Sequence, residues 1–225
     1  ASLAARAALL RRPTALAASD VAPGEPPWKK AALRLDGLTL ERRSTSHFVI
    51  VDDDGNIASM TSSIENAFGA RLMVEGFLLN NQLTDFSFAP RRDGAAVANR
   101  PQGGKRPRSS MSPTIVLREG RPLYALGSPG GSNIIAYVAK TLVALIDWEM
   151  DMQEAVALPH LTNRFGTYHI EAGTAAEELA GPLEALGYTV ELRALNSGLH
   201  GIAFNEDGTL VGGADPRREG VAVGD

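Results

Sequence analysis

The sequence predicts an α+β fold in which layers of helix and layers of antiparallel sheet pack on a shared core. Three segments read as β-hairpins, and helical segments lie between them. The chain has 225 residues, of which 44% are hydrophobic and 21% charged, as in ordinary globular proteins. No apolar stretch is long enough to cross a bilayer, so a membrane-spanning protein is not expected.

Residues 1–44 are expected to form a connector and not a core. An Ala-rich stretch at the start predicts a short helix, and the breaker-rich segment Ala22–Pro27 follows it. Its prolines cannot donate hydrogen bonds to a sheet. A mixed segment then runs to Ser44, and the chain becomes rich in β-formers from Thr45 onward.

Each predicted hairpin consists of two β-rich runs around turn residues that tolerate positive φ angles. The runs and the turns between them are 46–51 and 57–61 around 53–56, 114–118 and 123–127 around 119–122, and 200–204 and 209–213 around 205–208. Hairpins of this kind, separated by helices, indicate packed α and β layers.

Two helices are predicted between the hairpins. Apolar residues recur at helical spacing over Ser132–Asp147, and a weaker amphipathic pattern runs over Ala175–Leu186, where Gly181-Pro182 interrupts it. A strand is expected at Tyr188–Arg193.

Charge and composition exclude several classes of function. The net charge is −4 and cationic residues form only short clusters, so a nucleic-acid partner is not expected. Cysteine is absent, and the four histidines do not have the short spacing of zinc ligands on a helix. No cofactor or metal is therefore indicated. The chain starts without a methionine or a signal region, so we expect a piece of a longer protein.

Several segments occur in the order and at the spacing seen in gamma-glutamyltranspeptidases, and together they make the chain resemble that family over residues 45–225. They are STSH at 44–47, FLLNNQLTDF at 77–86, KRPRSSMSPT at 105–114, GSPGGS at 127–132 and DPR at 215–217. The resemblance implies an N-terminal-nucleophile hydrolase with an αββα sandwich, of which this chain is a part. Residues 1–44 would then be the end of the large subunit or a linker, and residues 45–225 the catalytic small subunit.

Thr45 is the predicted nucleophile. A threonine hydroxyl needs a base beside it, and an α-amino group serves only if threonine is the first residue. By resemblance, the hydroxyl attacks the preceding carbonyl and the chain is cut between Ser44 and Thr45. Without the other motifs, Thr45 would be read as a β-former that opens a strand.

Two further features are predicted to support the nucleophile. Gly130 and Gly131 precede a helix and offer unobstructed backbone N–H groups for a developing oxyanion, although Pro-Gly-Gly alone is typical of a turn. The resemblance places Ser63 where a hydroxyl residue hydrogen-bonds the nucleophile.

The resemblance also predicts the donor-binding residues. Gln82 and Asp85 match the contacts to an α-ammonium, and Ser109 and Ser110 match the contacts to an α-carboxylate; the alternative is a polar loop with capping serines. Glu65 departs from the asparagine that is usual at its position, although it could also contact the ammonium. Family members use, in addition, an arginine of the large subunit for the carboxylate.

The expected reaction is gamma-glutamyl transfer or hydrolysis, as of glutathione, through an ester on Thr45, with water or an amine as acceptor. Two alternatives stay open: a glutaryl or cephalosporin-type acylase and a poly-gamma-glutamate transpeptidase. They are suggested by Glu65 and by the segment between Phe86 and Lys105, which is shorter than in family members that carry a lid. An unprocessed, inactive fragment is a non-enzymatic alternative. The expected partner is the large subunit of the same precursor, and the resemblance implies a periplasmic or secreted location.

Overall fold

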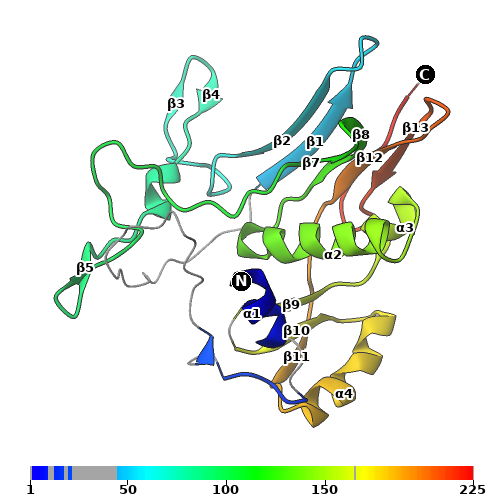
Figure 1. Cartoon of the computed structure of the whole chain (residues 1–225). Coiled ribbons are helices and arrows are strands. Elements are labelled where there is room, and N and C mark those ends of the chain that lie inside the picture. The colour runs from blue at the N-terminus through cyan, green and yellow to red at the C-terminus, as the bar shows by residue number, and fades with distance from the viewer. Residues whose placement is uncertain (1, 10–12, 18–19, 22–44, 165, 225) are drawn as a thin grey trace. The chain divides into compact units, whose positions relative to one another are not determined.

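The computed structural model describes residues 2–9, 13–17, 20–21, 45–164 and 166–224 (Figure 1). The predicted connector at 22–27 and the segment up to Ser44 lie outside the described residues. The chain divides into two compact units, which we describe separately. One comprises residues 34–158 and 196–225, and the other comprises residues 1–33 and 159–195.

The first unit is built on a four-stranded antiparallel sheet in the order β13-β12-β8-β7. Its strands are β7 (Thr114–Arg118), β8 (Arg121–Gly127), β12 (His200–Phe204) and β13 (Leu210–Ala214). Two of the predicted hairpins, β7–β8 and β12–β13, are thereby confirmed.

The turn between β7 and β8 has two residues, whereas the prediction gave it four, 119–122. Glu119 and Gly120 have φ angles of 53° and 79°, the left-handed pair typical of a two-residue hairpin turn. Pro122, which we assigned to the turn, lies within β8 opposite Leu117. The register shifts at Val116/Leu117, and such a bulge accommodates a residue that has no N–H to donate.

The remaining predicted hairpin, with runs 46–51 and 57–61, forms a second β layer. Strands β1 (Thr45–Val51) and β2 (Ile57–Ser63) pair in antiparallel register. The inward side of β1 is buried, and the His47 ring lies directly over Gly127, where an added Cβ would come within 2.2 Å of the ring. The two β layers therefore touch where β8 has no side chain.

Two helices cover the other face of the four-stranded sheet (Figure 1). The helix α2 (Ile134–Ile146) confirms the prediction, and the 3-10 turn η3 (Gly131–Asn133) precedes it. The short helix α3 (Met152–Ala157) was missed, although Asp151 and Glu154 form a capping box at its start. The buried core beneath the helices comprises Leu126, Tyr137, Ala144, Leu145, Met152, Ala155, Val156 and Leu199.

Short elements fill the stretch between β2 and β7. They are β3 (Met73–Val74), β4 (Phe77–Leu78), the 3-10 helix η2 (Gln82–Asp85), β5 (Arg91–Arg92) and β6 (Ala95–Ala96). The strands β3 and β4 form a hairpin that projects from the rest of the unit (Figure 1).

The second unit contains a three-stranded sheet in the order β11-β10-β9. Its elements are α1 (Ser2–Leu9), β9 (Leu161–Asn163), β10 (Tyr168–Glu171), η4 (Ala175–Leu179), α4 (Ala180–Ala185) and β11 (Val190–Arg193). The predicted helix at the start of the chain is confirmed, as is the strand that ends at Arg193, and the helix predicted at 175–186 is divided into the 3-10 helix η4 and the α-helix α4. Gly181-Pro182 does not end the second helix, because Pro182 lies in the first turn of α4, where its missing N–H costs nothing. Across the described residues, no helix has the length and hydropathy to cross a membrane.

Candidate active site

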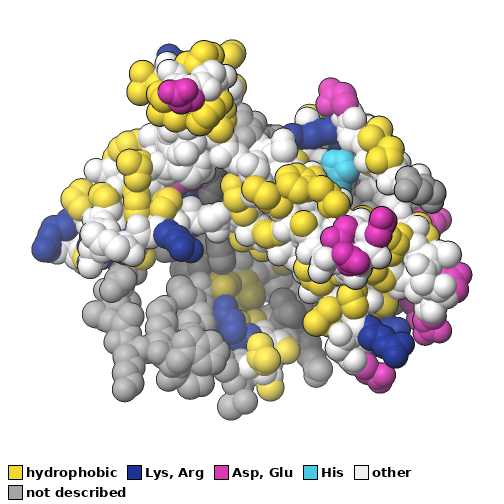
Figure 2. All heavy atoms as spheres, turned by 90° about the horizontal axis from the view of Figure 1, so that it is seen from above, with side chains coloured by type: hydrophobic (Ala, Val, Ile, Leu, Met, Phe, Trp, Pro, Cys, Tyr) yellow, Lys and Arg dark blue, Asp and Glu magenta, His cyan; other side chains and the backbone are white. Residues whose placement is uncertain are grey.

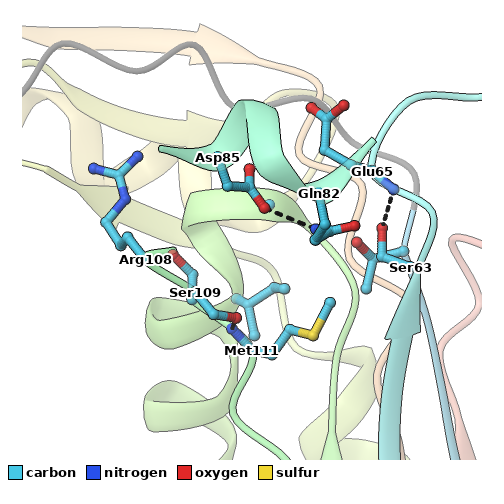
Figure 3. A pocket seen from close by; sticks show the side chains of 11 residues that line it. Ser63, Glu65, Gln82, Asp85, Arg108, Ser109 and Met111 are labelled. Carbon is cyan, nitrogen blue, oxygen red and sulfur yellow. Dashed lines mark hydrogen bonds between the residues drawn. The ribbon is translucent and has the colours of Figure 1, made fainter. Parts of the chain in front are cut away.

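One pocket of the first unit brings together eight of the nine predicted site residues (Figure 3). It is lined by Thr45, Ser63, Glu65, Gln82, Asp85, Arg108, Ser109, Ser110, Met111, Gly131 and Ile134. The ninth predicted residue, Gly130, immediately precedes Gly131 in the chain. Segments up to 89 residues apart thus meet at one place, between the start of β1 and the start of α2.

Thr45 is the first residue of β1, and only 7% of its surface is exposed. It faces Ser63 across the antiparallel pair, where side chains of opposed residues are neighbours. The Ser63 Oγ accepts a hydrogen bond from the Glu65 backbone N–H at 2.9 Å. Arg218, from beyond β13, donates from Nη1 to the Thr45 carbonyl oxygen at 3.3 Å and so holds the strand near its first residue.

Gly130 and Gly131 adopt backbone conformations that suit glycine, with φ angles of 136° and 60°. A Cβ on Gly130 would lie 2.6 Å from the Tyr137 ring, so a larger residue does not fit. Neither glycine N–H has an acceptor among the described residues. Because η3 and α2 follow directly, these N–H groups lie at the positive end of a helical segment, where they can stabilise an anion.

The 3-10 helix η2 presents Gln82 and Asp85 together. The Gln82 Nε2 donates to Asp85 Oδ2 at 2.7 Å, which orients the amide. Its other atom, Oε1, is buried and has no hydrogen-bond partner within the described chain. A buried acceptor beside a carboxylate is an arrangement that suits a cationic group with N–H donors.

Glu65 lines the pocket in a strained conformation. Its φ angle is 70°, which is uncommon for a residue other than glycine and costs about 1 kcal/mol or more. The Asn81 Nδ2 donates to Glu65 Oε2, and the Asn81 Oδ1 accepts from the Asn66 N–H at 3.0 Å. In Figure 3 the Glu65 carboxylate points away from Ser63, in keeping with its bond to Asn81.

Asn99 connects the two sides of the pocket. Its Nδ2 donates to the Asp85 carbonyl oxygen at 2.6 Å, and its Oδ1 accepts from the Arg108 N–H at 2.9 Å. The Ser109 Oγ accepts from the Met111 N–H at 3.2 Å. The predictions missed Asn99, Arg108 and Met111. Arg108 could have been found, because it directly precedes the predicted carboxylate contacts Ser109 and Ser110 in the sequence.

His47 lies on the same side of β1 as Thr45 and is neutral at physiological pH. Burial, and to a smaller extent the nearby His200, lowers the pKa of His47 to about 4. The His47 Nδ1 lies 2.9 Å from the Thr61 Oγ1. A neutral imidazole thus packs between β1 and β8, two residues after Thr45.

The Asp215-Pro216-Arg217 motif has a structural position next to the site. Burial on its own would raise the pKa of Asp215, but hydrogen bonds from Ser197 and from the N–H groups of Arg217, Leu199 and Gly198 outweigh it and lower the pKa to about 2. Arg217 lies 3.0 Å from the carboxylate and donates to the Leu158 carbonyl oxygen at 3.0 Å.

The chain was compared with models of protein families and with known proteins. The family model described as Gamma-glutamyltranspeptidase matches residues 2–225. A glutathione hydrolase proenzyme of Bacillus subtilis is 38% identical over 185 residues, which cover 80% of this chain and 30% of the proenzyme. An acylase ACY 1 proenzyme of a Pseudomonas species is 37% identical over 81% of this chain and 32% of its own length. The chain thus spans about a third of the length of these relatives.

A solved gamma-glutamyltranspeptidase of Pseudomonas nitroreducens, complexed with L-DON, has the same fold. It superposes with a TM-score of 0.71 and 34% identity over 80% of this chain and 99% of the solved chain. The predicted α+β fold of the N-terminal-nucleophile type is thereby confirmed, with this chain as a part of it.

Proposed function

This chain belongs to the gamma-glutamyltranspeptidase family, and we propose that it carries the catalytic Thr45 of an enzyme that transfers or hydrolyses gamma-glutamyl groups, as of glutathione. The observation that supports this best is the pocket itself. A threonine that can become an N-terminal nucleophile shares it with Gly131, which follows Gly130 in the chain, and with acceptors for an ammonium.

The first step is self-cleavage of the precursor. The Thr45 hydroxyl attacks the Ser44 carbonyl carbon, the peptide bond to the Thr45 nitrogen breaks, and an ester links Ser44 to Thr45. Water then hydrolyses this ester, which releases the Ser44 carboxylate and leaves Thr45 with a free α-amino group. This amine is a base with a pKa of about 8, suited to accept the hydroxyl proton.

Turnover uses the same hydroxyl on the donor. The Thr45 Oγ attacks the γ-carbonyl carbon, its proton passes to the α-amino group, and the oxyanion receives hydrogen bonds from the N–H groups of Gly130 and Gly131. The amine of the donor leaves with that proton, and a gamma-glutamyl ester remains on Thr45. Attack by water or by an amine acceptor reverses these steps and frees the enzyme.

Recognition of the donor is assigned to the far side of the pocket. The buried Gln82 Oε1 and the Asp85 carboxylate provide acceptors for the α-ammonium, and Ser109 and Ser110 provide hydroxyl donors for the α-carboxylate. Glu65, held by Asn81, adds a second carboxylate to the pocket lining. Ser63, opposite Thr45, is assigned to hydrogen-bond the nucleophile.

The partner in this proposal is the large subunit of the same precursor, and the location is periplasmic or secreted. Apolar side chains lie uncovered on the outer face of β1–β2, where Phe48, Ile50 and Met60 are 40%, 56% and 49% exposed. The β3–β4 hairpin is apolar as well, with Met73 and Phe77 more than 60% exposed (Figure 2). Uncovered surfaces of this kind are typical of interfaces.

The acylase alternative is supported by the ACY 1 relative, which resembles this chain nearly as closely as the glutathione hydrolase does. An acylase that takes a glutaryl group needs no ammonium contacts, so Gln82 and Asp85 favour the gamma-glutamyl donor. A poly-gamma-glutamate donor fits the short segment around β5 and β6 and the charge of Glu65. An unprocessed fragment that serves no reaction is the remaining alternative.

Mass spectrometry of the complete precursor tests the proposal. We expect two chains separated between Ser44 and Thr45, and, after a gamma-glutamyl anilide is added and quenched in acid, one glutamyl unit on the peptide that begins with Thr45. A Thr45→Ala precursor should remain whole and inactive. Cleavage of that variant at the same bond would refute the assignment of Thr45.

A further inference from the structure

We infer that Arg108 is a specificity-determining residue that binds the α-carboxylate of the donor from within this chain; the inference rests on the proposed function. Arg108 lines the pocket directly before the serine pair. The family resemblance assigns the cation for this carboxylate to the large subunit and gives position 108 no role. The structure therefore adds a second, independent source of positive charge.

The charges of the pocket indicate what Arg108 faces. Among the described residues that line it, Glu65 and Asp85 are the acidic side chains and Arg108 is the one cationic side chain. Two carboxylates and one guanidinium complement a ligand that carries a cationic and an anionic group. A guanidinium also matches a carboxylate geometrically, because it can donate two parallel hydrogen bonds.

The position of Arg108 fits the anionic group. In Figure 3 Arg108 lies at the opposite end of the pocket from Ser63, with Asp85 and Ser109 between them. The ammonium and the carboxylate of a gamma-glutamyl donor are attached to one carbon atom, so their binding residues must be neighbours. With Thr45 opposite Ser63, the γ-carbonyl end and the α-carbon end of the donor then occupy the two ends of the pocket.

The backbone of Arg108 is held in a defined relation to the ammonium contacts. Asn99 accepts from the Arg108 N–H at 2.9 Å and donates to the Asp85 carbonyl oxygen at 2.6 Å. Arg100, in the same stretch of chain, serves the loop instead, since it donates to the Val97 carbonyl oxygen at 3.2 Å and to the Gln102 side chain at 2.8 Å. Arg108 is one of the residues that line the pocket, and Arg100 is not.

The test uses the complete, processed enzyme and two donors, a gamma-glutamyl anilide and its α-carboxamide analogue, which has the same shape without the negative charge. Arg108→Leu should raise KM for the carboxylate donor about ten- to a hundredfold, the range of a charge-assisted hydrogen bond, and leave kcat nearly unchanged. KM for the carboxamide should stay as in the unaltered enzyme. Arg108→Lys keeps the charge but loses the forked geometry, so its KM for the carboxylate donor should lie between those of the unaltered enzyme and of Arg108→Leu.

Arg106→Leu is the matched control, because Arg106 is exposed like Arg108 and lies two residues away but does not line the pocket. It should leave both KM values unchanged. The inference is overturned if Arg108→Leu keeps the preference for the carboxylate, or if it weakens both donors equally, as a purely structural residue would. Absence of the glutamyl ester on Thr45 in the unaltered enzyme would instead refute the proposed function, so the two failures are distinguishable.

Discussion

Replacement of Asp215 by asparagine is expected to destabilise the fold and to do so in a pH-dependent way. Asp215 is 1% exposed and accepts from the N–H groups of Gly198 and Leu199 at 2.9 and 3.0 Å. Its partner Arg217 is also largely buried, with 13% of its side chain exposed. Asp215→Asn keeps the shape of the side chain and removes the charge from the pair.

The magnitude follows from the pKa of Asp215, which is about 2 in the folded chain against an ordinary value of 3.8. This difference corresponds to about 2 kcal/mol of stability at neutral pH. Because the folded pKa is the lower one, the contribution is complete above pH 3.8 and is lost as the pH falls toward 2; at pH 3 about half is gone. The uncompensated Arg217 adds to the cost, so we expect Asp215→Asn to lose about 3 kcal/mol at pH 7.

Urea unfolding of the complete enzyme, followed by circular dichroism at pH 7 and at pH 3, measures this. The difference between the unaltered enzyme and Asp215→Asn should shrink at pH 3, and other groups that titrate in both proteins cancel in it. Asp207→Asn, in the exposed turn between β12 and β13, is the control and should change stability little. A difference of the same size at both pH values would refute the role of the charge.

Three further predictions concern the site. Burial and the nearby His200 lower the pKa of His47 to about 4, so the folded enzyme should lose up to about 3 kcal/mol of stability as the pH falls from 6.5 to 4. In His47→Asn the urea concentration at the midpoint of unfolding should change much less with pH over that range. Asp85→Ala should lower kcat/KM for a gamma-glutamyl anilide at least about a hundredfold and affect a glutaryl anilide much less; equal losses would show that Asp85 supports the fold. Arg218→Ala, which removes the bond to the Thr45 carbonyl, should lower kcat about fivefold with KM unchanged, and a raised KM would contradict a role in positioning.

The sequence predicted the long elements well because their signals are local. The hairpins around 53–56 and 205–208 and the helix α2 follow from alternation, turn residues and helical spacing. The strands β3 to β6 have two residues each, too short for any periodicity to be read. Pro122 was misplaced because the bulge that accepts it depends on the register with β7, which the sequence does not display.

In the site, too, residues with a local sequence signal were predicted and residues that act through distant contacts were not. The residue types of the motifs, with the family resemblance, predicted eight of the residues that line the pocket. Asn99 and Arg218 could not be found in this way, because each acts on another segment through a hydrogen bond between positions distant in sequence: Asn99 lies 14 residues from Asp85, and Arg218 lies 173 residues from Thr45. Partners of this kind become visible only when the chain is folded.

The bonds of Asn99 also make the loop that precedes it a natural place for variation. The Ser87 N–H donates to the Asn99 carbonyl oxygen at 2.9 Å, so the two ends of the 88–98 loop are clamped together beside Asp85. Lengthening a loop with clamped ends costs little, because the closure entropy grows only with the logarithm of its length. Insertions at its exposed tip, residues 91–94, should therefore fold on an unchanged scaffold, provided that Val97, which is 1% exposed, keeps its place in the core.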